Sequence, residues 1–203
     1  MSHQIGVRIL LILNHVLAII GIVYSSLSWY LWIPVGFLLF GKFGSEIGNH
    51  RYAAHKSFET GPIRHFLLST LGIFNCYGSP ISWVIAHRAH HMNSDEELDP
   101  HSPHIIPWWR VWLTLWQKVN LPIKHYTDLL KDPIYKKGHK YYFYIIGITF
   151  LLLSLIDWRL PVFLISIPSV GIVHGAALVN VVCHKWGYRN FDTPDKSTNN
   201  WWV

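Results

Sequence analysis

Charged side chains are scarce in this sequence: they make up 14% of its 203 residues, while 51% of the residues are apolar. Soluble domains carry about 25% charged residues on average, so an ordinary soluble domain is excluded and a membrane protein is the first interpretation. Cysteine is also rare, because the chain has only Cys76 and Cys183, far apart in sequence. This excludes a disulfide framework, and we interpret both thiols as small buried hydrophobic groups.

Runs of basic residues are absent, although the net charge is +6. A nucleic-acid-binding protein would concentrate its Lys and Arg in such runs, so no nucleic-acid partner is expected. The first apolar block also lacks an A-x-A-type cleavage site, and we predict a retained span rather than a signal peptide. The 11 tryptophans and 10 tyrosines favour the boundary between water and lipid.

The long apolar blocks predict an all-α integral membrane protein with four transmembrane helices in two hairpins. A spanning helix needs about 20 apolar residues, and the expected spans cover residues 5–24, 29–48, 141–156 and 160–182. The stretch from Lys42, near the end of the second span, to Lys140, just before the third, holds 12 of the 17 Lys and Arg residues. By the positive-inside rule, this region and the C-terminus are expected on the cytoplasmic side, where the region would form a helical cap. We expect a single membrane domain over residues 1–203.

Two further apolar stretches are expected to lie at the membrane interface rather than to cross the bilayer. His65–Ala86 is interrupted by Gly78-Ser79-Pro80, and proline disrupts a continuing helix. A crossing there would also place the histidines described below on opposite faces. Ile105–Leu121 presents a broad apolar face rich in tryptophan, Trp116 among them, which predicts an interfacial helix.

Fourteen histidines are many for this length, and three of them stand together in WVIAHRAHH as His87, His90 and His91. At 100° per residue they fall on one narrow helical face, so their imidazoles can converge. We interpret them as metal ligands in preference to a solvated face that carries histidines by chance. Imidazole ligands suit Zn, Cu, Fe and Ni alike, so ligand type alone leaves the metal open.

Two other polar sets stand at the predicted cytoplasmic ends of spans. His50 and His55 are five residues apart, about 140° on a straight helix, and share a site only if the helix frays or bends. Asn180 and His184 stack at i, i+4; an Asn at bilayer depth indicates either function or an interhelical hydrogen bond. His174 lies deeper, and we expect it to be hydrogen-bonded in the core. Three sets on one membrane face indicate a metal centre.

The sequence around these sets resembles the membrane fatty-acid desaturases of the stearoyl-CoA type. HRYAAHKSF, which contains His50 and His55, is similar to the first histidine box of that family, and SWVIAHRAHH to the second. LDPHSP resembles its Asp-Pro-His segment, and HKWGYRNFDT the stretch that follows its fourth span. The resemblance covers essentially the whole chain in the same order.

This resemblance implies an oxidoreductase that uses O2, two electrons and two iron ions to desaturate a fatty acyl chain in lipid biosynthesis. The chain would be carried by CoA or a lipid, and the electron donor would be of ferredoxin or cytochrome b5 type. No catalytic group beyond the metal ligands is implied. The implied direct iron ligands are His50, His55, His87, His90, His91 and His184, with Asn180 acting through a water.

The resemblance also implies details around the centre. Trp83 would line the acyl tunnel, although a boundary tryptophan is the equal alternative. The family often has Trp where this chain has Ala177, so a wider tunnel is expected and the double-bond position is left open. Carboxylates orient metal-bound histidines in many sites, but a solvated loop charge is the default for any single acid here. The candidates for that orienting role are Asp95, Glu96, Glu97 and Asp99.

The family has a third box, HxxHH, which the sequence does not reach before Val203. We therefore expect a fragment with part of the iron site, inactive by itself; desaturated product from it in a desaturase-deficient host would contradict this expectation. A membrane hydroxylase or ketolase with similar boxes is an alternative. A haem electron carrier would need axial histidines deep within spans, and a metal transporter would line its spans with ligands.

Overall fold

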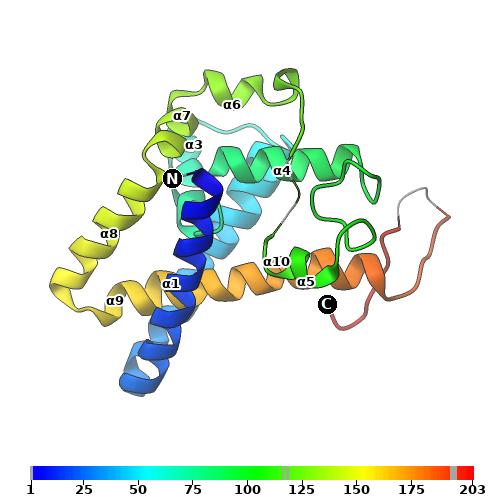
Figure 1. The fold of residues 1–203 in the computed structure, drawn as a ribbon. Coiled ribbons are helices and arrows are strands. Elements are labelled where there is room, and N and C mark those ends of the chain that lie inside the picture. Colours follow the sequence, from blue (N-terminus) through cyan, green and yellow to red (C-terminus); the bar gives the residue numbers. More distant parts are fainter. Residues whose placement is uncertain (1, 116, 118, 193–195) are drawn as a thin grey trace. The chain divides into compact units, whose positions relative to one another are not determined.

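The computed structural model describes residues 2–115, 117, 119–192 and 196–203, and within them all regular elements are helices (Figure 1). An isolated antiparallel bridge joins Tyr188 and Asn199. The chain divides into two compact units, each made of two stretches. Unit 1 comprises Met1–Val84 and Tyr126–Ile172, and unit 2 comprises Ile85–His125 and Val173–Val203. The all-helical prediction is confirmed for the described residues.

Three helices are long and apolar enough to cross a membrane: His3–Tyr24, Leu27–Ala54 and Arg159–Lys185. They coincide with three of the four predicted spans. The first is α1; the second is built from η1 (Leu27–Leu31), α2 (Trp32–Gly36) and η2 (Phe37–Ala54); the third from α9 (Arg159–Pro161), η5 (Val162–Ser166) and α10 (Ile167–Lys185). Each contains a long stretch of mainly apolar side chains, and a helix suits such a stretch in a membrane because its backbone groups bond to one another and need no water.

The fourth predicted span, 141–156, corresponds to α8 (Tyr142–Ile156), which has 15 residues. It follows α7 (Pro133–Lys140) at a bend of 73°, visible in Figure 1, and reaches spanning length only if this bent pair counts as one span. Four spans and the two-hairpin layout therefore stay predictions.

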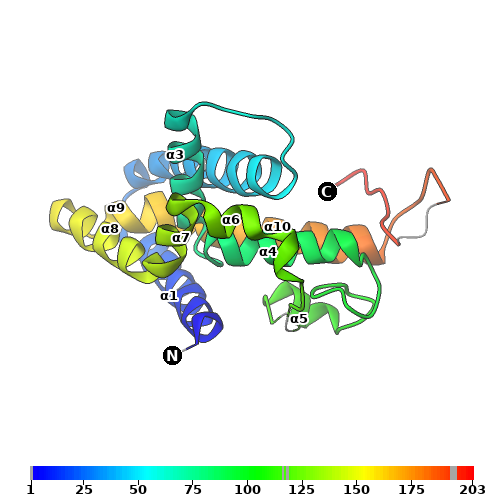
Figure 2. The same ribbon diagram turned by 90° about the horizontal axis from the view of Figure 1, so that it is seen from above.

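Helices in unit 1 approach one another closely where glycine replaces a larger side chain. α1 packs against η5, which it crosses in Figure 1. η2 packs against α3 (Pro62–Leu71), as Figure 2 shows. A Cβ added to Gly44 of η2 would lie 2.6 Å from the backbone oxygen of Leu71. Beside this contact Asn49 Nδ2 donates to Gly72 O at 3.2 Å, which ties η2 to the end of α3.

The predicted interruption of His65–Ala86 is confirmed. α3 and η3 (Gly72–Asn75) are separated from α4 (Pro80–Met92) by a turn in which Cys76 and Gly78 have φ of 61° and 144°. Ser169 Oγ donates to Asn75 O at 2.7 Å, and the Tyr142 hydroxyl accepts from Gly78 N at 3.2 Å. The turn is thus held by side chains of α10 and α8.

The interfacial helix predicted over Ile105–Leu121 is much shorter among the described residues. α5 spans only Trp108–Trp112, because Thr114 takes a left-handed conformation with φ of 56°. Val111 packs with Ile106 and Val181 in the core of unit 2. Trp116, part of the predicted apolar face, and the neighbouring Lys118 lie outside the described residues. The remaining short helices are η4 (Ile123–His125) and α6 (Thr127–Lys131).

Candidate metal centre

His50, in the last turns of η2, and His55, the residue that caps its end, face one another because η2 is not an α-helix. η2 is a π-helix, in which each N–H bonds to the carbonyl five residues earlier. His55 N donates to His50 O at 3.0 Å, and the two rings stand edge to face with centroids 4.6 Å apart. His50 Nδ1 is also 3.4 Å from Glu46 Oε1. The two rings are therefore brought together by a wider helical turn, rather than by the fraying or bend that the sequence predicted.

The three histidines of WVIAHRAHH are all on α4, where the predicted shared face is found. His87 Nε2 and His91 Nε2 are 3.1 Å apart, with ring centroids separated by 4.5 Å. His90 is buried, and its ring centroid is 5.4 Å from that of His91. α4 thus presents one pair of facing imidazole nitrogens beside one buried imidazole.

Asp99 orients His90. His90 Nδ1 donates to Asp99 Oδ2 at 2.8 Å, and the backbone N–H groups of Asp95 and His101 donate to the same carboxylate at 2.8 and 3.0 Å. Asp99 is fully buried. Burial alone would raise the pKa of its carboxyl, but the hydrogen bonds and the charge of His90 hold that pKa below the usual value. Asp99 therefore holds Nδ1 of His90, and Nε2 is the ring nitrogen that this contact does not use.

Asp95 orients His184 in the same way. His184 Nδ1 donates to Asp95 Oδ2 at 2.9 Å, while Ser102 Oγ and Lys196 N donate to Asp95 at 2.6 and 3.0 Å. Burial works to raise the pKa of Asp95, and these hydrogen bonds bring it below its ordinary value. The rings of His90 and His184 are 5.2 Å apart, so α4 and α10 bring two carboxylate-paired histidines together within unit 2.

His101 completes this buried group. Its ring stacks on His90 with centroids 4.3 Å apart, and burial lowers its pKa to about 3, with the nearby charge of His90 as the next cause. His90, Asp99 and His101 each offer one ligand atom, and these atoms lie within 4.8 Å of one another. Asp99 already accepts three hydrogen bonds, so we assign it to orienting His90 and not to binding the metal. We assign His101 to packing against the ring of His90.

The donor set fits a transition metal. Two nitrogens bound at right angles to one metal, each at about 2.1 Å, would be about 3 Å apart, close to the 3.1 Å between His87 and His91. A metal-bound histidine almost always donates its second ring N–H to a carboxylate or carbonyl. His90 and His184 both do so. A soft thiolate site is excluded for the described residues of this group, because its donors are imidazoles and carboxylates.

The other predicted residues are less determined by the structure. Asn180 is half-buried on α10, one turn before His184. Trp83 is half-buried, with its ring edge to face with His50 at 6.2 Å, and Ala177 is 3% exposed. His174 accepts from Trp112 Nε1 at 3.0 Å, which confirms its predicted hydrogen bond. The tunnel roles of Trp83 and Ala177 stay predictions.

Comparison with known proteins finds relatives along most of the chain. It is 36% identical over 196 residues to the sn-1 stearoyl-lipid 9-desaturase of Anabaena variabilis, covering 93% of this chain and 72% of that protein. It is 32% identical over 195 residues to Delta-9 acyl-lipid desaturase 2 of Arabidopsis thaliana, covering 93% of this chain and 63% of that protein. It is 31% identical over 188 residues to the acyl-CoA C20 Delta5-desaturase of Anemone leveillei, covering 88% of this chain and 60% of that protein.

The chain therefore spans 60–72% of the length of these three relatives. No protein-family model matches it.

Proposed function

The chain belongs to the membrane fatty-acid desaturase family, and from this premise we propose that it takes part in the O2-dependent desaturation of a fatty acyl chain at a di-iron centre. The observation that carries the proposal is the pair of buried contacts His90–Asp99 and His184–Asp95. These contacts hold the rings of His90 and His184 in the orientation that a metal ligand needs. The chain that carries them is related to enzymes named as desaturases.

Each histidine has a stated part in this proposal. His90 and His184 would bind iron through Nε2, since Nδ1 of each is held by a carboxylate. His87 and His91 would bind through the facing nitrogens of α4, and His50 and His55 through the pair that η2 aligns. Asn180 would act on one iron through a water. When bound, iron supplies the oxidising power that removes hydrogen from an unactivated alkyl chain.

The substrate is proposed to be a fatty acyl chain carried by a lipid or by CoA, because the relatives are named for both carriers. Trp83 and Ala177 would line the tunnel that holds it. Ala177 is 3% exposed and smaller than the Trp that the family often has there, so the tunnel would be wider. The position of the double bond is therefore left open. Electrons would come from a ferredoxin- or cytochrome b5-type donor.

The membrane arrangement is part of the proposal. Three helices of spanning length and a bent fourth pair support a multi-pass protein. The Lys and Arg residues between the predicted hairpins support a cytoplasmic location for the histidines, by the positive-inside rule.

Metal analysis tests the centre. The protein purified in maltoside detergent is expected to retain iron, measured by inductively coupled plasma mass spectrometry, and His184→Ala and His90→Ala are expected to lose it. His139→Gln is the matched control, because His139 is an exposed histidine outside the three sets. Iron retention unchanged by His184→Ala and His90→Ala would contradict the ligand assignment.

Product analysis tests the reaction. The complete reading frame that contains this sequence, expressed in a desaturase-deficient host, is expected to yield acyl chains with a new double bond in gas chromatography–mass spectrometry, whereas residues 1–203 alone are expected to yield none. An alcohol or a carbonyl product would instead assign a hydroxylase or ketolase. A purified protein with a Soret absorption band would assign the haem carrier.

A further inference from the structure

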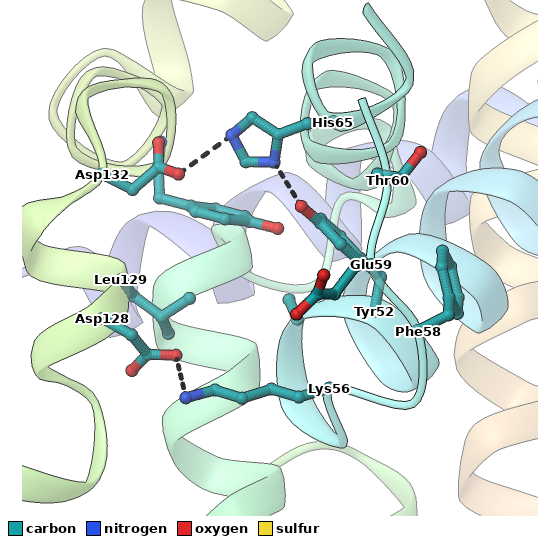
Figure 3. A pocket seen from close by; sticks show the side chains of 11 residues that line it. Tyr52, Lys56, Phe58, Glu59, Thr60, His65, Asp128, Leu129 and Asp132 are labelled. Atoms are coloured by element: carbon teal, nitrogen blue, oxygen red, sulfur yellow. Dashed lines mark hydrogen bonds and ion pairs between the residues drawn. The ribbon is translucent and has the colours of Figure 1, made fainter. Parts of the chain in front are cut away.

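A polar cavity of about 420 Å³ lies within unit 1, between the end of η2 with the segment that follows it and the helices α6 and α7 (Figure 3). Its walls come from two stretches far apart in sequence. The residues around it include Tyr52, Lys56, Phe58, Glu59, His65, Asp128, Asp132 and Tyr135.

Short polar contacts hold the walls of this cavity in place. Lys56 Nζ is 3.0 Å from Asp128 Oδ2 at one end of the opening in Figure 3. At the other end, His65 stands between Tyr52 and Asp132: its Nδ1 accepts from the Tyr52 hydroxyl at 3.0 Å, and its Nε2 donates to Asp132 Oδ2 at 2.9 Å. The polar groups are therefore positioned before any ligand arrives, which reduces the entropic cost of binding.

Asp132 is fixed a second time by the backbone. Its Oδ1 accepts from Ile134 N at 2.8 Å and from Tyr135 N at 3.3 Å, so the same carboxylate caps the N-terminus of α7. This contact places Tyr135, one turn into α7, against the cavity.

The charges around the cavity favour a cation. Three carboxylates, from Glu59, Asp128 and Asp132, face a single lysine, Lys56. Glu59 makes no ion pair or hydrogen bond with any residue in the part of the chain that the structure describes. The rings of Tyr52, Phe58 and Tyr135 also line the site, and aromatic faces attract organic cations.

One buried hydroxyl indicates what kind of cation fits. Tyr135 is 4% exposed, and its hydroxyl oxygen makes no hydrogen bond that meets the distance and angle criteria among the described residues, although the Ser69 side chain is near enough to oppose the rise that burial causes in the Tyr135 pKa. A buried hydroxyl without a partner costs about 1–3 kcal/mol, and a ligand with an N–H donor would remove that cost. A primary ammonium provides such a donor, whereas a quaternary ammonium does not.

We propose that this cavity binds the primary ammonium group of a small amine-bearing ligand, of the size of ethanolamine. Glu59 and Asp128 attract its charge, the aromatic rings enclose it, and the Tyr135 hydroxyl accepts one of its N–H groups. A free amine and the head group of an amine lipid share this chemistry. The site does not depend on iron or on the desaturase reaction.

Direct binding measurements test the proposal on the full chain in maltoside detergent. Radiolabelled ethanolamine is expected to bind saturably in equilibrium dialysis, and choline to compete at least about tenfold less well, because it has no N–H to donate. Added NaCl is expected to weaken binding. Absence of saturable ethanolamine binding, or equal competition by choline, would overturn the proposal.

Two variants locate the bound amine. Glu59→Gln removes an exposed charge and Tyr135→Phe removes only an unpaired hydroxyl, so both should fold. Each is expected to weaken ethanolamine binding by about tenfold, with the Tyr135→Phe melting temperature unchanged or higher. Glu97→Gln, an exposed acid of unit 2, is the matched control and should bind as the wild type does. Wild-type affinity in both cavity variants would refute the site.

Nanodiscs separate the two sources of the ammonium group. In discs of phosphatidylglycerol, free ethanolamine is expected to bind as in detergent. Displacement of ethanolamine when phosphatidylethanolamine is added to the discs would assign the lipid head group, and undiminished binding would assign a free amine. Each of these results supports the ammonium site, while loss of binding in the discs without phosphatidylethanolamine would count against it.

Discussion

Asp95 Oδ2 and His184 Nδ1 are joined by a hydrogen bond of 2.9 Å across 89 positions of sequence. Asp95 is buried in a loop after α4, and His184 lies in the last turn of α10. The contact turns the Nε2 atom of His184 away from the carboxylate and makes that nitrogen a better metal ligand. The loop therefore acts on the proposed centre through the orientation of one ring.

Asp95→Asn tests this role. The amide has nearly the shape of the carboxylate but lacks its charge, so His184 is held less firmly. We expect iron affinity to fall by roughly 10–100-fold, the usual effect of losing such a partner. Competition with a chelator on the purified protein measures it. The exposed Glu97→Gln is the control, and equal iron affinity in Asp95→Asn and wild type would show that the contact has only a structural role.

Asp99→Ala is expected to destabilise unit 2 as well as the centre. The substitution leaves the buried His90 Nδ1 and two backbone N–H groups without their acceptor. Removing one partner of a buried ion pair costs about 3–5 kcal/mol. We expect a lower melting temperature and faster amide hydrogen exchange at residues 95–104. Glu96→Ala, an exposed neighbour, should change neither, and slow exchange retained in Asp99→Ala would contradict the prediction.

Much of the fold followed from hydropathy and helical period. Three predicted spans match helices of spanning length, and the break at Gly78-Ser79-Pro80 is present. The π-helical turn of η2 was not predictable, because the 3.6-residue period assumed for every helix places His50 and His55 about 140° apart. Their five-residue spacing was itself the signal, since a π-helix aligns residues five apart.

The carboxylates of the site show where sequence reasoning ends. Four acids near WVIAHRAHH were equal candidates, and the structure selects Asp95 and Asp99 for His184 and His90. Their selection depends on a loop in which Asp95 takes a left-handed conformation with φ of 60°. Spacing cannot indicate such a conformation, because contacts with Ser102 and Lys196 stabilise it. His87, His90 and His91 were easier to place, since they lie on one regular α-helix, α4.

Gly44→Ala is expected to weaken the packing of η2 against α3. The added Cβ would lie 2.6 Å from Leu71 O and 2.9 Å from Gly72 N, and these backbone atoms cannot move aside cheaply. We expect a loss of about 1–3 kcal/mol, typical of overpacking, seen as a lower melting temperature in detergent. Gly147→Ala is the matched control: it lies in α8 with nothing within 4 Å of the added atom. A Gly44→Ala protein as stable as Gly147→Ala would refute this account of the packing.

Cys76 is expected to be chemically inert while the protein is folded. It is fully buried, and burial raises the pKa of its thiol to about 12, against smaller opposing contributions from Ser169 and Asn14. The thiolate is the reactive form. Because the pKa is raised, the thiolate fraction stays negligible throughout the range from pH 7 to pH 9. A maleimide at pH 8 should therefore leave Cys76 unlabelled.

A variant with one cysteine makes this prediction measurable. In Cys183→Ser the only thiol left is Cys76, so mass spectrometry should find no maleimide adduct in the folded protein and one adduct after denaturation in SDS. Raising the pH to 9 should not introduce labelling, because the maleimide cannot reach the buried Cys76 and the raised pKa keeps its thiol protonated. In Cys76→Ala, by contrast, the half-buried Cys183 should be labelled without SDS. Rapid labelling of the folded Cys183→Ser protein would show that the turn between η3 and α4 opens far more readily than its hydrogen bonds to Ser169 and Tyr142 indicate.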